Sequence, residues 1–174
     1  MSQNLRPDHL RRVNRLLKPA TLQDAGLNMT AAPEMRDLAH RLLIYEASVG
    51  NASEPMGSPT LRVYEKLRQS LVESVGVAGF QSLASRALTL ARLEAPSLGV
   101  ARIGADGYLH GLGEIETQVG MDKDRGGESG IILIARLLGL LRTFLGEALT
   151  FSLLRNAWPG EVFDDRNAVN GRKA

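Results

Sequence analysis

The sequence contains no cysteine and few aromatic residues. Its 174 residues include four Phe, three Tyr and one Trp, and no Cys. The missing Cys excludes disulfide bonds, thiolate metal sites, iron–sulfur clusters and a cysteine nucleophile. The shortage of aromatic side chains argues against a β-sandwich or β-barrel, because these folds rely on aromatic and β-branched pairs across neighbouring strands.

A large net charge is missing as well. The chain has 21 Lys and Arg against 19 Asp and Glu, a formal net charge of +2, and its hydrophobic residues make up 44%. This balance excludes an intrinsically disordered protein. The length suits one domain with a substantial core, and the frequent residues Leu, Ala, Arg and Glu all favour helices. The sequence therefore predicts a mainly α fold, a single-domain helical bundle.

Four segments carry apolar residues at the spacing of a buried helical face. They are predicted to run from Pro33 to Val49, from Pro59 to about Val75, from about Phe80 to Glu94, and from about Glu128 to Trp158. Gly76 and Gly79 separate the second segment from the third. Residues 100–103 and 108–112, joined by an Asp-Gly turn, predict a small β-hairpin insertion.

The last predicted helix, from about Glu128 to Trp158, is apolar over most of its circumference. Such a helix must be covered nearly all round, so we expect a central helix, a subunit interface, or both. One sector holds only small residues, where we expect another backbone to approach closely: Ala135, Gly139, Thr143, Gly146 and Thr150. The residues predicted to form a partner interface are Leu137, Leu141, Phe144 and Phe151.

The same helix contains charged residues. Arg136 and Glu147 lie eleven residues apart, and so nearly on one line of a continuous helix. They form a possible polar cluster, and a pocket beside them is what an enzyme or a small-ligand-binding bundle would need. These charges, with Arg142, also argue against a membrane span over Ile131 to Leu154.

Metal and cofactor sites find little support. The three His residues are far apart, and Asp37 with His40 is the only pair at ligand spacing on a helix. A di-iron bundle needs a second such motif and further glutamates. We therefore expect no metal, no cofactor and no catalytic residue of these kinds.

The first 18 residues are basic, and a contact with an anionic partner would rest on Arg11, Arg12, Arg15 and Lys18. No aromatic residues for base stacking lie between them, and no helix-turn-helix pattern follows. We therefore prefer solvated charges on a peripheral helix, and keep a nucleic-acid-associated protein as the alternative. The chain then divides into a basic N-terminal helix and linker (1–32), the helical bundle (33–158) and a flexible tail (159–174).

Several stretches resemble a group of small, uncharacterised bacterial helical proteins with no known activity. The stretches are Ala39-His-Arg-Leu-Leu-Ile-Tyr-Glu-Ala, Glu65-Lys-Leu-Arg, Gly79-Phe-Gln-Ser-Leu and the segment from Leu137 to Thr150. The resemblance covers roughly Glu34 to Trp158, implies a bacterial setting, and carries no functional residue.

The function expected from the residues is that of a non-catalytic interaction protein. We expect an adaptor or regulatory protein that self-associates, or docks onto a protein partner, through its long apolar helix. Residues 1–8 lack the apolar core of a secretory signal, and the chain has no Cys, so a cytoplasmic location is expected.

Overall fold

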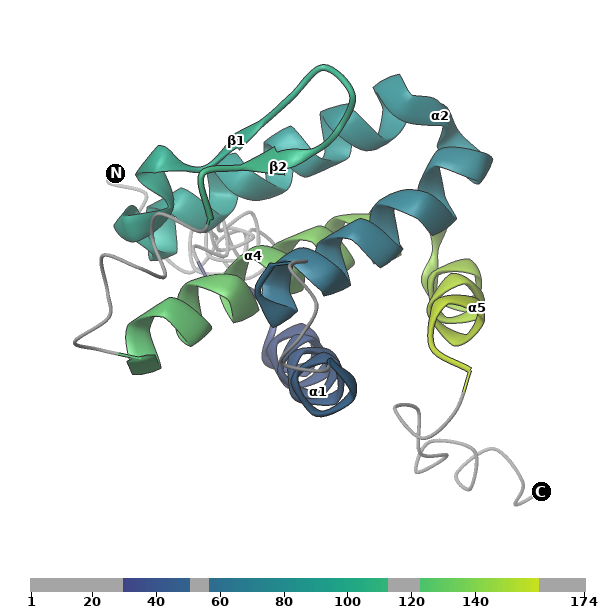
Figure 1. The fold of residues 1–174 in the computed structure, drawn as a ribbon. Coiled ribbons are helices and arrows are strands. Elements are labelled where there is room, and N and C mark those ends of the chain that lie inside the picture. The colour runs from purple at the N-terminus through teal and green to yellow at the C-terminus, as the bar shows by residue number, and fades with distance from the viewer. Residues whose placement is uncertain (1–29, 51–56, 113–122, 160–174) are drawn as a thin grey trace, which may run out of the picture.

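The computed structural model of the chain describes residues 30–50, 57–112 and 123–159, with no side-chain detail for 123–126. Helices dominate these segments, which confirms the predicted mainly α class (Figure 1). The elements in chain order are α1 (Pro33–Val49), α2 (Pro59–Glu94), the 3-10 helix η3 (Pro96–Val100), β1 (Arg102–Ile103), β2 (Leu109–His110), α4 (Lys123–Leu145) and α5 (Glu147–Ala157).

Helix α1 begins and ends at the residues that the sequence predicted. Pro33 stands in its first turn, where a missing N–H costs nothing, and the acidic Glu34 suits the positive end of the helix dipole. The buried face differs from the prediction at its C-terminal end, because Val49 is exposed and Glu46 is buried instead. Glu46 lies four residues after Leu42, so the buried face includes a carboxylate in the last turn of α1.

Helix α2 is bent at Gly76. The φ and ψ angles of Gly76 are 75° and 167°, a left-handed conformation that only glycine adopts without strain. At its start, the hydroxyl of Ser58 caps the helix by accepting a hydrogen bond from the Leu61 N–H at 3.3 Å. The two helices predicted on either side of Gly76 are confirmed as two arms, 59–75 and 77–94, which form a V (Figure 1).

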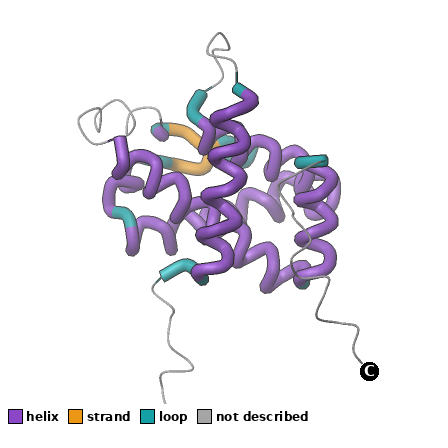
Figure 2. Tube along the Cα trace, turned by 90° about the horizontal axis from the view of Figure 1, so that it is seen from below, coloured by secondary structure: helices purple, strands orange, loops and turns teal. Residues whose placement is uncertain are grey.

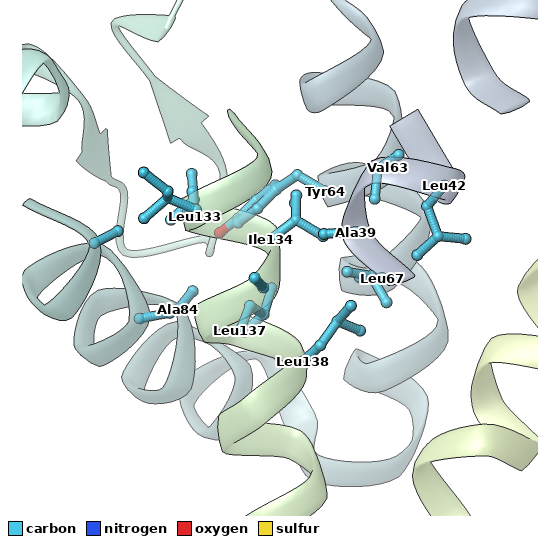
Figure 3. Close-up of a cluster of buried hydrophobic side chains, with 14 of the residues drawn as sticks. Ala39, Leu42, Val63, Tyr64, Leu67, Ala84, Leu133, Ile134, Leu137 and Leu138 are labelled. Atoms are coloured by element: carbon cyan, nitrogen blue, oxygen red, sulfur yellow. The ribbon is translucent and has the colours of Figure 1, made fainter. Parts of the chain in front are cut away.

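Helix α4 is the central helix, as the sequence predicted. It packs against α1 and against α2. Figure 3 shows its apolar side chains between residues of α1 and of both arms of α2. The labelled side chains are Ala39 and Leu42 of α1, Val63, Tyr64, Leu67 and Ala84 of α2, and Leu133, Ile134, Leu137 and Leu138 of α4. Burying each large aliphatic side chain stabilises the fold by roughly 1.5–3 kcal/mol.

The predicted hairpin is confirmed, with shorter strands than expected. Strands β1 and β2 pair antiparallel, with Arg102 opposite His110 and Ile103 opposite Leu109. The turn requires Gly107, whose φ is 79°. Its carbonyl accepts a hydrogen bond from the Tyr64 hydroxyl at 2.7 Å, which ties the hairpin to the first arm of α2. Figure 2 shows the two strands set among the helices.

The single helix predicted from Glu128 to Trp158 is wrong at Gly146. This residue has φ 83° and ψ 163°, and it separates α4 from α5. In a continuous helix, the buried faces of α4 (around Leu137) and of α5 (Thr150 and Leu154) would point ~130° apart. The break turns α5 so that it packs beside the first arm of α2 (Figure 1). On a single helical wheel the segment from Glu128 to Trp158 is apolar nearly all round, because it contains two helices with different buried faces.

The middle of the row of small residues is open and has no other backbone packed against it. A Cβ added at Gly139 would meet no atom within 4 Å, and Thr143 and Gly146 are exposed. The two ends of the row, Ala135 and Thr150, are buried. The close approach occurs instead at Gly130, near the start of α4, where an added Cβ would collide with the side chain of Thr60 in the first turn of α2.

Two glycine-to-alanine changes in α4 should therefore shift stability in opposite directions. Gly130→Ala forces the buried Thr60 side chain to move, and we expect it to lower the free energy of unfolding by about 1–3 kcal/mol. Gly139→Ala adds a methyl group to open space within a helix, so we expect a gain of about 0.5–1 kcal/mol. Urea denaturation followed by circular dichroism measures both, and equal effects of the two changes would contradict the close contact at Gly130.

Candidate functional site

The predicted interface residues fall into two groups. Leu137 and Leu141 are buried in the chain's own core, so the prediction that they contact a partner is wrong for both. Phe151 is partly buried and packs against the core. Phe144, in the last turn of α4, is 61% exposed. Only Phe144 offers most of its apolar side chain to a partner.

The break at Gly146 creates an exposed surface where α4 meets α5. Phe144 is 61% exposed on one side of the break, and Leu149 is 47% exposed on the other. Apart from Leu145, all residues from 143 to 149 are exposed. Exposed apolar patches are typical of protein–protein contact sites. We name this region the corner surface, which consists of Thr143, Phe144, Gly146, Glu147, Ala148 and Leu149.

The structure does not bring Arg136 and Glu147 together. Arg136 donates from Nε to Oε1 of Glu94, at the end of α2, over 2.5 Å. Glu147 is exposed in the first turn of α5, where the helix dipole favours a negative charge. The polar cluster predicted from a straight helix is thus replaced by an ion pair between α4 and α2.

Glu94 is the centre of the first of two buried ionic clusters. Its side chain is only 6% exposed. It accepts hydrogen bonds from Arg36 Nη2 at 2.8 Å, from the Ala31 N–H at 2.9 Å, and from Arg136. Three segments of the chain therefore meet at one carboxylate: the start of α1, the end of α2 and the middle of α4.

Glu46 is the centre of the second cluster, at the other end of α1. Its Oε1 accepts from Lys66 Nζ at 2.5 Å and from the indole Nε1 of Trp158 at 2.7 Å. Arg62 Nη2 donates to the main-chain oxygen of Glu46 at 2.6 Å. Lys66 also lies 5.6 Å from the centre of the Trp158 ring, within cation–π range.

Both carboxylates lie in the last turn of a helix, where the dipole disfavours negative charge. Each is compensated by two cationic side chains, so the pairs hold α1 at both ends. The sequence reasoning missed both residues. Glu46 had a usable signal, because it repeats the buried position of Leu42 after one turn. Glu94 had none, since its partners Arg36 and Arg136 are 58 and 42 residues away.

A third polar group lies at the tip of the hairpin. Arg68 pairs with Glu65 at 2.7 Å, and its guanidinium lies 3.9 Å from the centre of the Tyr108 ring. Burial acts to raise the pKa of Glu65, but hydrogen bonds from Arg68 and Gln69 outweigh it and hold the pKa below its usual value. Burial raises the pKa of Tyr64 far above its usual 10.0.

The other candidates from the sequence find no site in the described part of the chain. Arg11, Arg12, Arg15 and Lys18 lie outside the described residues. Asp37 and His40 are exposed on α1, and no group of three or more His, Asp or Glu among the described residues is placed to hold a metal ion. None of the described helices is both long enough and apolar enough to cross a bilayer.

No protein-family model, curated protein or solved structure matches the chain. The three polar groups pair opposite charges or bury hydroxyl and indole donors against acceptors, which is the arrangement of structural contacts. The corner surface faces outward, and among the described residues other apolar side chains such as Val49 and Leu93 are exposed as well.

Neutralising Glu94 should destabilise the fold strongly. Glu94→Gln leaves two guanidinium groups without their carboxylate, and we expect a loss of roughly 3 kcal/mol in the free energy of unfolding. The matched control is Glu34→Gln. Glu34 pairs with Arg142 at 3.0 Å, but its side chain is 78% exposed. An exposed pair contributes less than about 1 kcal/mol. Urea denaturation compares the two, and similar losses would contradict a clamp at Glu94.

Tyr64 should make the fold sensitive to alkali. Above pH 10.0 the tyrosine of the unfolded chain ionises while the folded chain, whose Tyr64 pKa is raised, keeps its proton. The unfolded state is then favoured, so stability falls as the pH rises above 10. Tyr64→Phe removes this titration and should flatten the decline, although it loses about 1 kcal/mol at neutral pH with the Gly107 hydrogen bond. Melting temperatures from pH 8 to about 11.5 test this, and parallel profiles would contradict it.

Proposed function

We propose that this chain is a non-catalytic interaction protein that binds a second copy of itself through the corner surface. The observation that carries the proposal is the exposure of Phe144 and Leu149, at 61% and 47%, on either side of Gly146. An aromatic and an aliphatic side chain placed this way can supply the apolar centre of a contact.

The charges around the corner surface favour an identical partner. Arg142, whose guanidinium also pairs with the exposed Glu34, immediately precedes the surface, and the exposed Glu147 lies within it. In a two-fold contact each copy presents the same patch, so an acidic group of one copy can face a basic group of the other. The apolar centre then lies between two pairs of opposite charge. A different protein partner is the alternative, and the experiment below separates the two.

The two other candidate functions receive less support. An enzymatic or ligand-binding bundle was expected to use Arg136 with Glu147, and these residues belong to different surroundings. A nucleic-acid contact would depend on residues 11–18, which lie outside the described part of the chain. Nothing in the described residues adds to either proposal.

Polar changes at the corner surface should weaken self-association. We expect Phe144→Gln with Leu149→Gln to raise the dimer dissociation constant about tenfold or more, because each removes an apolar anchor. Glutamine keeps the helix, so the melting temperature should stay nearly constant. Sedimentation velocity over a concentration series measures the effect.

The matched control is Leu93→Gln. Leu93 is also 61% exposed, but it lies on the second arm of α2. It should leave the dissociation constant unchanged. A wild-type chain that remains monomeric at every concentration would overturn self-association. An equal effect of Leu93→Gln would show that exposed apolar area, and not the corner surface, drives it.

A further inference from the structure

The connection between α4 and α5 consists of one residue, Gly146. Its backbone already makes hydrogen bonds at helical spacing on both sides: its N–H donates to Arg142 at 3.0 Å, and its carbonyl accepts from the Thr150 N–H at 3.1 Å. The helix is interrupted by its φ of 83° and ψ of 163°, and no atom lies within 4 Å of the place a Cβ would take. At the hinge itself, the helix is interrupted only by the backbone conformation of one glycine. The packing of α5 on α2 and the hydrogen bond from Trp158 to Glu46 hold α5 in its turned position.

The site in which α5 packs, called its seat below, is formed by α1 and α2 as well as by α4. The buried residues of α5 are Thr150 and Leu154, and α5 packs on α2 as well as on α4. Directly after it, Trp158 is 2% exposed and donates its indole N–H to Glu46 of α1 at 2.7 Å. The side chains that fill this seat are therefore Thr150, Leu154 and Trp158, which all lie within residues 147–158.

A helical Gly146 would join α4 and α5 into one straight helix. The three N–H groups at the start of α5, at residues 147–149, have no intrahelical partner while the break persists, and they would gain one. The eleven residues of α5 would extend about 16 Å beyond the end of α4. Their buried face would point ~130° away from that of α4, so Leu154 and Trp158 would leave their own seat.

We propose that α5 exchanges between two copies of this chain, with Gly146 as the hinge. In the exchanged dimer, α4 and α5 of each copy form one continuous helix. Thr150, Leu154 and Trp158 of one copy occupy the seat on α1 and α2 of the other, with the same Trp158–Glu46 hydrogen bond. A short connection that holds an element against its own body is a recurrent origin of such exchange.

This proposal does not rest on the corner surface. The exchanged dimer needs only the hinge and the seat, whereas self-association through Phe144 and Leu149 needs the break to persist. The two can be separated by working in the Phe144→Gln, Leu149→Gln chain, in which the corner contact is removed. A dimer that persists in this chain without a change at Gly146 would overturn the corner contact.

The decisive comparison is Gly146→Ala against Gly139→Ala in that chain. Alanine is strained at the φ of 83° and ψ of 163° of Gly146 and favours the helix there, whereas Gly139 already lies inside helix α4. Both added methyl groups enter open space. Multi-angle light scattering gives the mass, and the fluorescence of Trp158, the chain's one tryptophan, reports whether its seat is occupied.

We expect Gly146→Ala to double the measured mass and to keep the emission maximum and acrylamide quenching of buried Trp158. Gly139→Ala should remain a monomer with the same emission. A Gly146→Ala monomer with red-shifted, readily quenched emission would overturn the proposal, because α5 would then leave its seat without entering another. A monomer with buried Trp158 would also overturn it, because the break would not depend on glycine.

A second measurement uses the wild-type chain, in case the Gly146→Ala variant does not fold. The chain is unfolded in urea and refolded at micromolar and at near-millimolar concentration, then diluted to one common concentration. Exchange predicts a dimer fraction that appears only after concentrated refolding and decays slowly on dilution, since α5 must leave its seat. Identical profiles, or a dimer that dissociates at once, would contradict it.

Discussion

The apolar face of α4 can be removed from water only if other helices cover it from several directions, and the rest of the structure depends on this requirement. Leu133, Ile134 and Leu137 are fully buried, and their neighbours come from α1 and from both arms of α2 (Figure 3). One straight α2 would cover α4 along a single line. The bend at Gly76 lets the same helix contact α4 twice. The hairpin is tied to the first arm through the hydrogen bond from Tyr64 to Gly107.

Hydrophobic contact is non-directional, so it does not by itself decide how α1 lies on this core. The two buried carboxylates fix the orientation of α1 through ion pairs and hydrogen bonds, which are directional. Glu94 binds the N-terminal end of α1, and Glu46, at its C-terminal end, binds the first arm of α2 and Trp158. Each carboxylate lies in the last turn of a helix, where the dipole disfavours a negative charge. The free-energy cost of burying it there is offset only when its paired Arg and Lys side chains are in contact with it. The hydrogen bond to Trp158 also connects the far end of α5 to α1.

The break at Gly146 lets α4 and α5 pack on the same core, and it leaves the residues around it exposed. Because the buried faces of α4 and α5 would point in different directions on one helix, the break is required for both to face the same core. The same break exposes Phe144 and Leu149 and leaves α5 attached through a single residue. The features that suit this chain for contact with a second copy are therefore consequences of how it covers its own core.

Apolar spacing, Pro33, Pro59 and the glycine at position 76 are local signals, so the helical segments could be predicted from the residues alone. The bounds of α1 and the position of the hairpin could be predicted in the same way. The remaining features depend on how the helices pack. Arg136 finds Glu94 and not Glu147, because ion pairs form between residues that packing brings together from distant positions. Gly146 breaks the last helix although both flanking segments are strong helix formers, because only a turn there lets Leu137 and Leu154 enter one core. A helical wheel assumes a straight axis, and the axis is set by the surface against which the helix must pack.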